Sequence, residues 1–124
     1  MTEQLSLFDV MRAPPVRKPV DPNGDVYQGK IHTVLKLNHP KMAWSQARIE
    51  IHPIRESWMW ATEFNTGTGG AGYRVGEKWG QFARSREDAA YWAIKEIRDR
   101  LCGREETKGT KAILRWLNDI EGTL

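Results

Sequence analysis

Four prolines lie close together near the start of the chain, at positions 14, 15, 19 and 22. Proline fixes φ, lacks a backbone N–H donor and pushes the residue before it out of the helical region. This composition disfavours both a helix and a paired strand. We therefore expect residues 1–26 to form a flexible tail and linker, and residues 27–124 to form one folded domain.

Beyond the prolines, the chain shows the alternation of apolar and polar residues that is typical of strands. Strands are predicted at 30–37, 47–52 and 58–64, and a short fourth strand begins at 73–75 and continues over 79–82 after a bend. No helix fits between these stretches. The spacing therefore favours an antiparallel meander over a parallel sheet.

The third predicted strand carries the largest side chains of the sheet. Trp58, Trp60 and Phe64 share one of its faces, which we expect to be buried. Pro53 is expected either to end the second strand or to mark an edge of the sheet, because proline cannot donate to the ladder.

The pattern changes from strand to helix at Ser85, a good N-cap residue with acidic residues in the turn that follows. Apolar residues then recur at helical spacing as far as Leu101, and Gly103 is a credible stop. A second helix is predicted over 110–121. The predicted fold class is therefore α+β, with an antiparallel sheet of about four strands followed by two C-terminal helices packed on one face.

Composition limits the classes to which the protein can belong. The formal net charge is +3, with 19 basic and 16 acidic residues, which is only mildly basic. Cys102 is the only cysteine, so the sequence excludes an internal disulfide and a thiolate-rich metal site. No apolar run approaches the length of a membrane span, and the N-terminus lacks the pattern of a secretory signal. We expect a cytoplasmic protein without membrane contact.

Motifs for catalysis or cofactor binding are weak. The loop at 67–72 matches the G-x-G-x-x-G pattern of dinucleotide sites, yet that pattern needs a helix directly after it, and 73–75 is strand-like. His32, His39 and His52 do not have the spacing of metal ligands. No serine, cysteine or lysine lies in a recognisable nucleophile motif. We expect no enzyme activity, no cofactor and no metal site.

The residues Gln4-Leu5-Ser6-Leu7-Phe8 form an apolar linear peptide ahead of the prolines. An apolar peptide on a proline-rich linker suits presentation to a groove of another protein. The pentapeptide resembles the motif by which bacterial polymerases, initiation regulators and repair proteins dock on the ring-shaped DNA sliding clamp. The resemblance implies that Gln4 orients the peptide at the edge of the clamp pocket, that Leu5, Leu7 and Phe8 anchor it, and that Ser6 is a spacer. The alternative is a structural role, in which the same apolar residues pack on the chain's own domain as an N-terminal strand.

Aromatic and basic residues are interleaved between positions 58 and 86. Aromatic rings stack on bases and basic groups bind phosphates, so this stretch predicts a nucleic-acid-binding face. Its candidate contact residues are Arg74, Lys78, Trp79, Arg84 and Arg86. The alternative is that the rings form the core while the charges keep the outer face solvated.

A second resemblance covers about a dozen residues of the folded domain. Trp79-x-x-Phe82, followed by Ser85-x-Glu87-Asp88-Ala89-Ala90, is similar to the end of the last strand and the start of the helix in DNA-binding domains of the AP2 and integrase-arm type. The resemblance implies DNA binding by the domain. The earlier strands do not match, so no base-contacting residue is carried over.

Three functions follow from these observations. The first is a small non-enzymatic adaptor or inhibitor that docks on the bacterial sliding clamp through its N-terminal peptide, while its folded domain contacts DNA or another protein. The second is a nucleic-acid-binding module that uses an aromatic and basic sheet face. The third is an inhibitor of phage or plasmid type that acts by protein binding.

Overall fold

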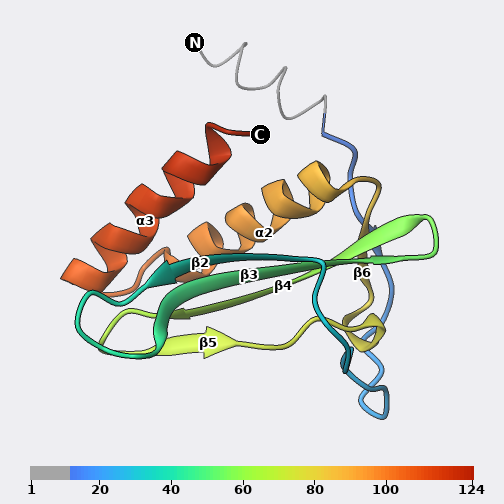
Figure 1. Cartoon of the computed structure of the whole chain (residues 1–124), viewed down its shortest axis with the longest axis horizontal. Helices are drawn as coiled ribbons and strands as arrows, with labels where there is room; N and C mark the ends of the chain where they lie inside the picture. Colours follow the sequence, from blue (N-terminus) through green and yellow to red (C-terminus); the bar gives the residue numbers. More distant parts are fainter. Residues whose placement is uncertain (1–11) are drawn as a thin grey trace.

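The structure is a computed structural model that describes residues 12–124. Within this range, six strands form one sheet in the order β1-β6-β4-β3-β2, with β5 also paired to β4. Helices α2 and α3 lie on one face of the sheet (Figure 1). The fold is therefore α+β, with an antiparallel sheet followed by two C-terminal helices, as the sequence predicts.

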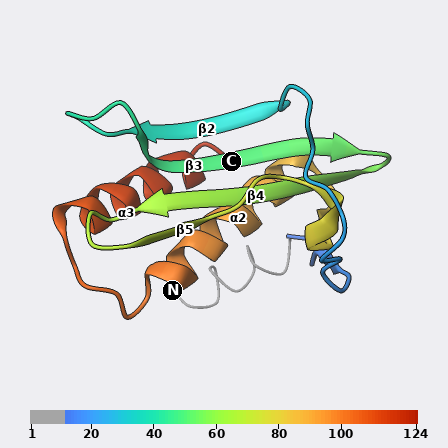
Figure 2. The same cartoon turned by 90° about the horizontal axis from the view of Figure 1, so that it is seen from below.

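A three-stranded antiparallel meander forms the body of the sheet. Its strands are β2 (Thr33–Asn38), β3 (Ser45–Ile54) and β4 (Ser57–Asn65). Figure 2 shows β3 between the other two. The three predicted strands are present, with ends that differ by a few residues.

Pro53 marks an edge and does not end its strand. It pairs with Trp58 of β4, and β3 continues beyond it to Ile54. The first pair between β2 and β3 joins Thr33 to Ile51, so the other side of β3 has no partner strand at Pro53. A proline there removes no ladder hydrogen bond.

The predicted strand at 73–75 is wrong. The glycine-rich stretch before it forms β5 (Gly70–Gly72), and the chain then makes a 3-10 turn at Glu77–Trp79 and returns as β6 (Gln81–Ala83). Glycines are poor strand formers in general, but here the backbones lie very close. A Cβ on Gly72 would lie 2.7 Å from Cγ of Glu63 on β4, so only glycine fits.

Helix α2 (Arg86–Leu101) begins where the sequence predicts. The Ser85 hydroxyl oxygen accepts a hydrogen bond from the backbone N–H of Asp88 at 3.0 Å. Helix α3 (Lys108–Glu121) begins two residues earlier than predicted, because Thr107 caps it by accepting from the N–H of Thr110 at 3.1 Å. Among the described residues, no helix is long and apolar enough to cross a membrane.

The core lies in two parts, on the two faces of the sheet. The larger part lies under the helices and contains Trp60 and Phe64, as predicted, with Trp58 partly buried beside them. The smaller part lies on the opposite face. Its buried members are Met59, Ala61, Val75 and Phe82.

Helix α3 approaches the end of the sheet very closely at Gly109. A Cβ at this position would lie 2.6 Å from the carbonyl oxygen of Thr66, which belongs to the loop after β4. Alanine normally favours a helix over glycine by about 1 kcal/mol. We nevertheless expect Gly109→Ala to lower the free energy of unfolding by about 1–3 kcal/mol, because the methyl group forces the helix away from the loop. Urea unfolding measures this, with exposed Lys108→Ala as the control; a raised midpoint for Gly109→Ala would contradict the packing.

Candidate functional site

The described part of the predicted tail, residues 12–26, is attached to the folded domain. We call this segment the strap. Val16–Arg17 forms β1, which pairs with β6, and the N–H groups of Lys18 and Asp21 donate to the carbonyl oxygens of Gly80 and Lys78 at 2.7 and 2.8 Å. Residues 12–26, which the sequence predicted to be part of a flexible tail and linker, therefore contact the folded domain. The prolines permit this attachment because the donors that bond to the domain come from the residues between them.

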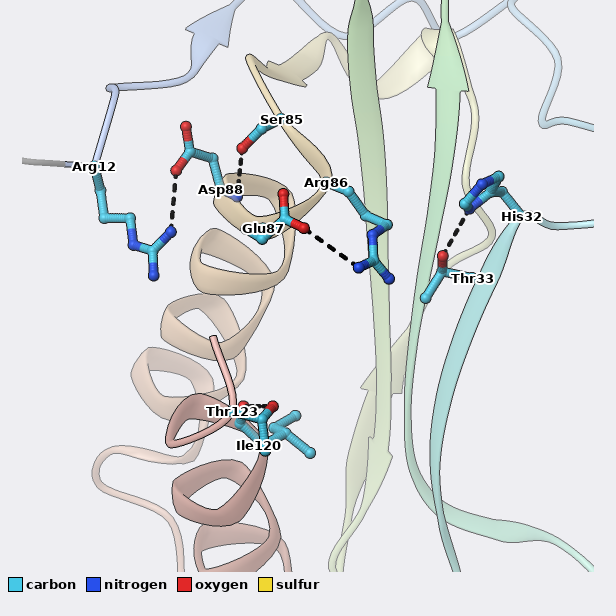
Figure 3. A network of polar contacts seen from close by, with 9 residues as sticks. All are labelled: Arg12, His32, Thr33, Ser85, Arg86, Glu87, Asp88, Ile120 and Thr123. Atoms are coloured by element: carbon cyan, nitrogen blue, oxygen red, sulfur yellow. Dashed lines mark hydrogen bonds and ion pairs between the residues drawn. The ribbon is translucent and has the colours of Figure 1, made fainter.

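The first residues of the strap are fixed on the N-terminal half of α2. Arg12 forms an ion pair with Asp88, with 3.4 Å between Nη1 and Oδ1, and its guanidinium lies 5.5 Å from the centre of the Tyr91 ring. The indole N–H of Trp92 donates to the carbonyl oxygen of Ala13 at 3.0 Å. The chain therefore enters the described fold at a defined place, beside the first turns of α2 (Figure 3).

The predicted clamp-binding residues, Gln4, Leu5, Ser6, Leu7 and Phe8, lie outside the described residues. Phe8 precedes Arg12 by four positions. A peptide at positions 4–8 is therefore close in sequence to an anchored point, whereas the sequence predicted a long linker between the peptide and the domain.

A half-enclosed pocket of about 200 Å³ lies between α2, α3 and the β2–β3 pair. We call it the α2–α3 pocket. It exists because α3 ends at Glu121 and leaves part of the apolar sheet face uncovered. The apolar side chains that line it are Leu35, Ile51, Ala90, Ile94, Ile120 and the partly exposed Leu124.

The rim of the α2–α3 pocket is polar. Arg86 and Glu87, in the first turn of α2, form an ion pair with 3.3 Å between Nη2 and Oε1. Thr33 on β2 and Thr123 after α3 also line the pocket, and Figure 3 shows them apart from this ion pair. An apolar floor with a charged rim suits a hydrophobic side chain on a solvated peptide better than it suits a charged ligand.

The predicted nucleic-acid-binding residues fall into two groups. Arg74, Lys78 and Trp79 lie together in the β5–β6 connection, where the Trp79 indole N–H donates to the Arg74 carbonyl oxygen at 2.7 Å and the Lys78 Nζ lies 5.0 Å from the centre of the Trp79 ring. Arg84 lies after β6, and Arg86 lies at the rim of the α2–α3 pocket. The structure therefore brings three of the five together and places the other two at the start of α2.

A different aromatic residue, which the sequence patterns did not single out, is exposed in the loop that precedes β3. Trp44, just before β3, is 40% exposed and borders a groove of about 390 Å³ on the β3–β4–β5 side of the molecule. Gly70 and Gly72 form part of the floor, and Glu63 also lines the groove. No periodic pattern marks Trp44, because it lies in a loop before the strand begins.

A partly buried polar cluster joins β4 to α2. The Glu96 carboxylate accepts hydrogen bonds from the Trp60 indole N–H at 3.4 Å, from the Tyr73 hydroxyl at 2.7 Å and from the Thr62 hydroxyl. Gln81 donates to the Trp60 carbonyl oxygen at 2.9 Å, where β4 has no partner strand between β5 and β6. This cluster replaces missing ladder bonds and closes the sheet onto α2. Its role is structural.

The cluster makes stability sensitive to alkaline pH. Burial, and then the charge of Glu96, raises the pKa of the Tyr73 hydroxyl well above its usual value. The folded state therefore holds this proton more tightly than the unfolded chain does. The contribution of this proton to the free energy of unfolding is complete below the unfolded pKa of about 10 and is lost as the pH rises above it.

We expect the free energy of unfolding to fall above about pH 10, and to fall less steeply with pH in Tyr73→Phe. Urea unfolding between about pH 8 and pH 11 measures both slopes. Equal slopes would contradict the assignment.

Comparison with known proteins adds no relative to this picture: no protein family, no curated protein and no solved structure matches the chain. Within residues 12–124, no group of three or more histidine, cysteine, aspartate or glutamate side chains is placed to hold a metal ion. The features that bear on function are therefore the pentapeptide and the surfaces described above.

Proposed function

We propose that this protein is a small non-enzymatic adaptor or inhibitor that docks on the bacterial DNA sliding clamp through Gln4–Phe8. The observation that carries the proposal is the complete pentapeptide, which ends four residues before the anchored Arg12. All five positions agree with the motif that the sequence resembles. A cytoplasmic location belongs to this proposal, because the clamp acts on DNA there.

The anchored strap limits where the folded domain lies on the clamp. Four residues span at most about 14 Å when fully extended. With Arg12 held by Asp88, the domain stays next to the clamp pocket that the peptide occupies. A long flexible linker would allow the domain to reach distant partners, whereas this geometry restricts it to partners on or beside the clamp.

Binding energy comes from the three apolar side chains of the peptide. Their burial contributes about 25 cal/mol per Å² of apolar area, and ordering the peptide offsets part of that gain. The balance corresponds to a dissociation constant in about the micromolar range. Such an affinity suits a partner that is recruited to the clamp or that competes with a polymerase for its pocket.

The folded domain supplies the second contact of the proposed adaptor. An exposed Trp44 beside an open groove, with the exposed Lys36 on β2, favours DNA as that contact, since rings stack on bases and basic groups bind phosphates. Two linked contacts raise occupancy through effective concentration. Protein binding by the same surface is the alternative, and it agrees with an inhibitor of phage or plasmid type.

The experiment compares the whole chain with a version that begins at Arg12. Every described strand and helix remains in the shorter chain. We expect both versions to unfold cooperatively, and only the whole chain to bind the purified clamp in a surface plasmon resonance titration. Equal clamp binding by the two versions would refute the proposal, because the contact would then lie in residues 12–124.

A further inference from the structure

The α2–α3 pocket has the chemistry of a site for one or two apolar side chains. Its volume is about 200 Å³, and its floor includes Leu35, Ile94 and Ile120. Arg86 and Glu87 at the rim form an ion pair, so these two side chains together present no net charge to a ligand. Grooves of this kind, formed by helices over a sheet, bind hydrophobic anchors of short peptides.

The chain carries such anchors within reach of this pocket. Arg12 lies against Asp88 on one side of the first turns of α2, and Arg86 lies on the other side, toward the pocket (Figure 3). A helix with its side chains is about 10–12 Å across. Phe8 and Leu7 precede Arg12 by four and five residues, which span up to about 14 and 18 Å when extended. A path around half of a helix of that width is about 16–19 Å long. The five residues from Leu7 to Arg12 cover it when almost fully extended, and Phe8 reaches the far side with the added length of its own side chain.

We propose that the α2–α3 pocket binds Leu7 and Phe8 of the same chain. Because the proposed clamp contact uses the same two side chains, the two contacts exclude each other. The pocket then acts as an internal competitor that holds the peptide until a clamp is present. This competition depends on the proposed function, whereas the intramolecular contact does not.

Competition of this kind has a measurable size. The apparent dissociation constant of the clamp complex increases by the inverse of the fraction of molecules whose peptide is free. If the pocket holds the peptide in about nine molecules of ten, the whole chain binds the clamp about tenfold more weakly than a variant with a blocked pocket. Thr123 is suited to blocking, since its exposed side chain lies at the rim.

The first test is methyl NMR on the whole chain with labelled isoleucines. Leu7→Ala/Phe8→Ala is compared with the unchanged protein. We expect the signals of Ile51, Ile94 and Ile120 to shift, and those of Ile31 and Ile54, on the opposite side of the sheet, to stay in place. Unchanged signals for the three pocket isoleucines would overturn the proposal, whatever the clamp does.

The second test uses the clamp and a matched pair of variants. Thr123→Trp places a large ring over the pocket, and Lys111→Trp places the same ring on an exposed position near the other end of α3. We expect Thr123→Trp to bind the clamp about tenfold more tightly than Lys111→Trp and the unchanged chain. Equal affinities would overturn the competition. Absence of clamp binding in all three proteins would refute the proposed function, and the NMR comparison would still decide the intramolecular contact.

Discussion

Replacing both apolar anchors, Leu7→Ala/Phe8→Ala, is expected to weaken binding of the whole chain to the sliding clamp by at least about tenfold. Each buried Leu or Phe side chain contributes about 1.5–3 kcal/mol, and about 1.4 kcal/mol is a factor of ten in affinity. The two side chains together account for a loss of at least about 150-fold, and the gain of about tenfold from release from the α2–α3 pocket leaves a net loss of at least about tenfold. Isothermal titration calorimetry with purified clamp measures it.

Ser6→Ala is the matched control for this result. It lies between the anchors but is only a spacer in the motif that the sequence resembles. We expect its affinity to stay within about threefold of the unchanged chain, in line with the small effects of substitutions at energetically neutral interface positions. If Ser6→Ala weakened binding as much as the double replacement, the peptide would not bind in the proposed way.

The second large effect concerns stability. Trp60 on β4 is 1% exposed, packs under α2 and donates its indole N–H to Glu96. Replacing it by alanine leaves a large cavity and removes one donor from the polar cluster. We expect Trp60→Ala to lower the free energy of unfolding by about 3–5 kcal/mol, a large share of the 5–15 kcal/mol that is typical of small domains.

Urea unfolding followed by circular dichroism measures this change, and Trp44→Ala is its control. Trp44 is 40% exposed, so its loss should lower the free energy of unfolding by less than about 1 kcal/mol. Similar losses for the two tryptophans would mean that Trp60 does not hold the helix layer on the sheet.

Local patterns predicted most of the fold. Alternation around Trp60 identified the buried face of β4, and the Ser85 cap identified the start of α2, because both signals depend on neighbours in sequence. The contacts of the strap were not predicted, because they join residues that are far apart in sequence. Its ion pair joins Arg12 to Asp88 across 76 positions of sequence, and no local signal reports a contact of that range.

The candidate surfaces were predicted less well than the fold. Strand β5 was not predicted because a glycine-rich stretch is typical of a loop. The lack of side chains on these glycines lets the backbone of β5 approach Glu63 on β4. The α2–α3 pocket depends on where α3 ends relative to β2, which is a property of packing. The pentapeptide lies outside the described residues, so its assignment depends on the sequence alone and stays a prediction.

The central claim is that residues 4–8 bind the clamp as a linear peptide, and the most direct test is a titration of purified bacterial clamp with a fluorescent peptide of residues 1–10. Fluorescence anisotropy should rise and saturate with a dissociation constant in about the micromolar range, while a scrambled peptide of the same composition should not bind. If neither peptide shows saturable binding up to about 1 mM clamp, the claim is contradicted.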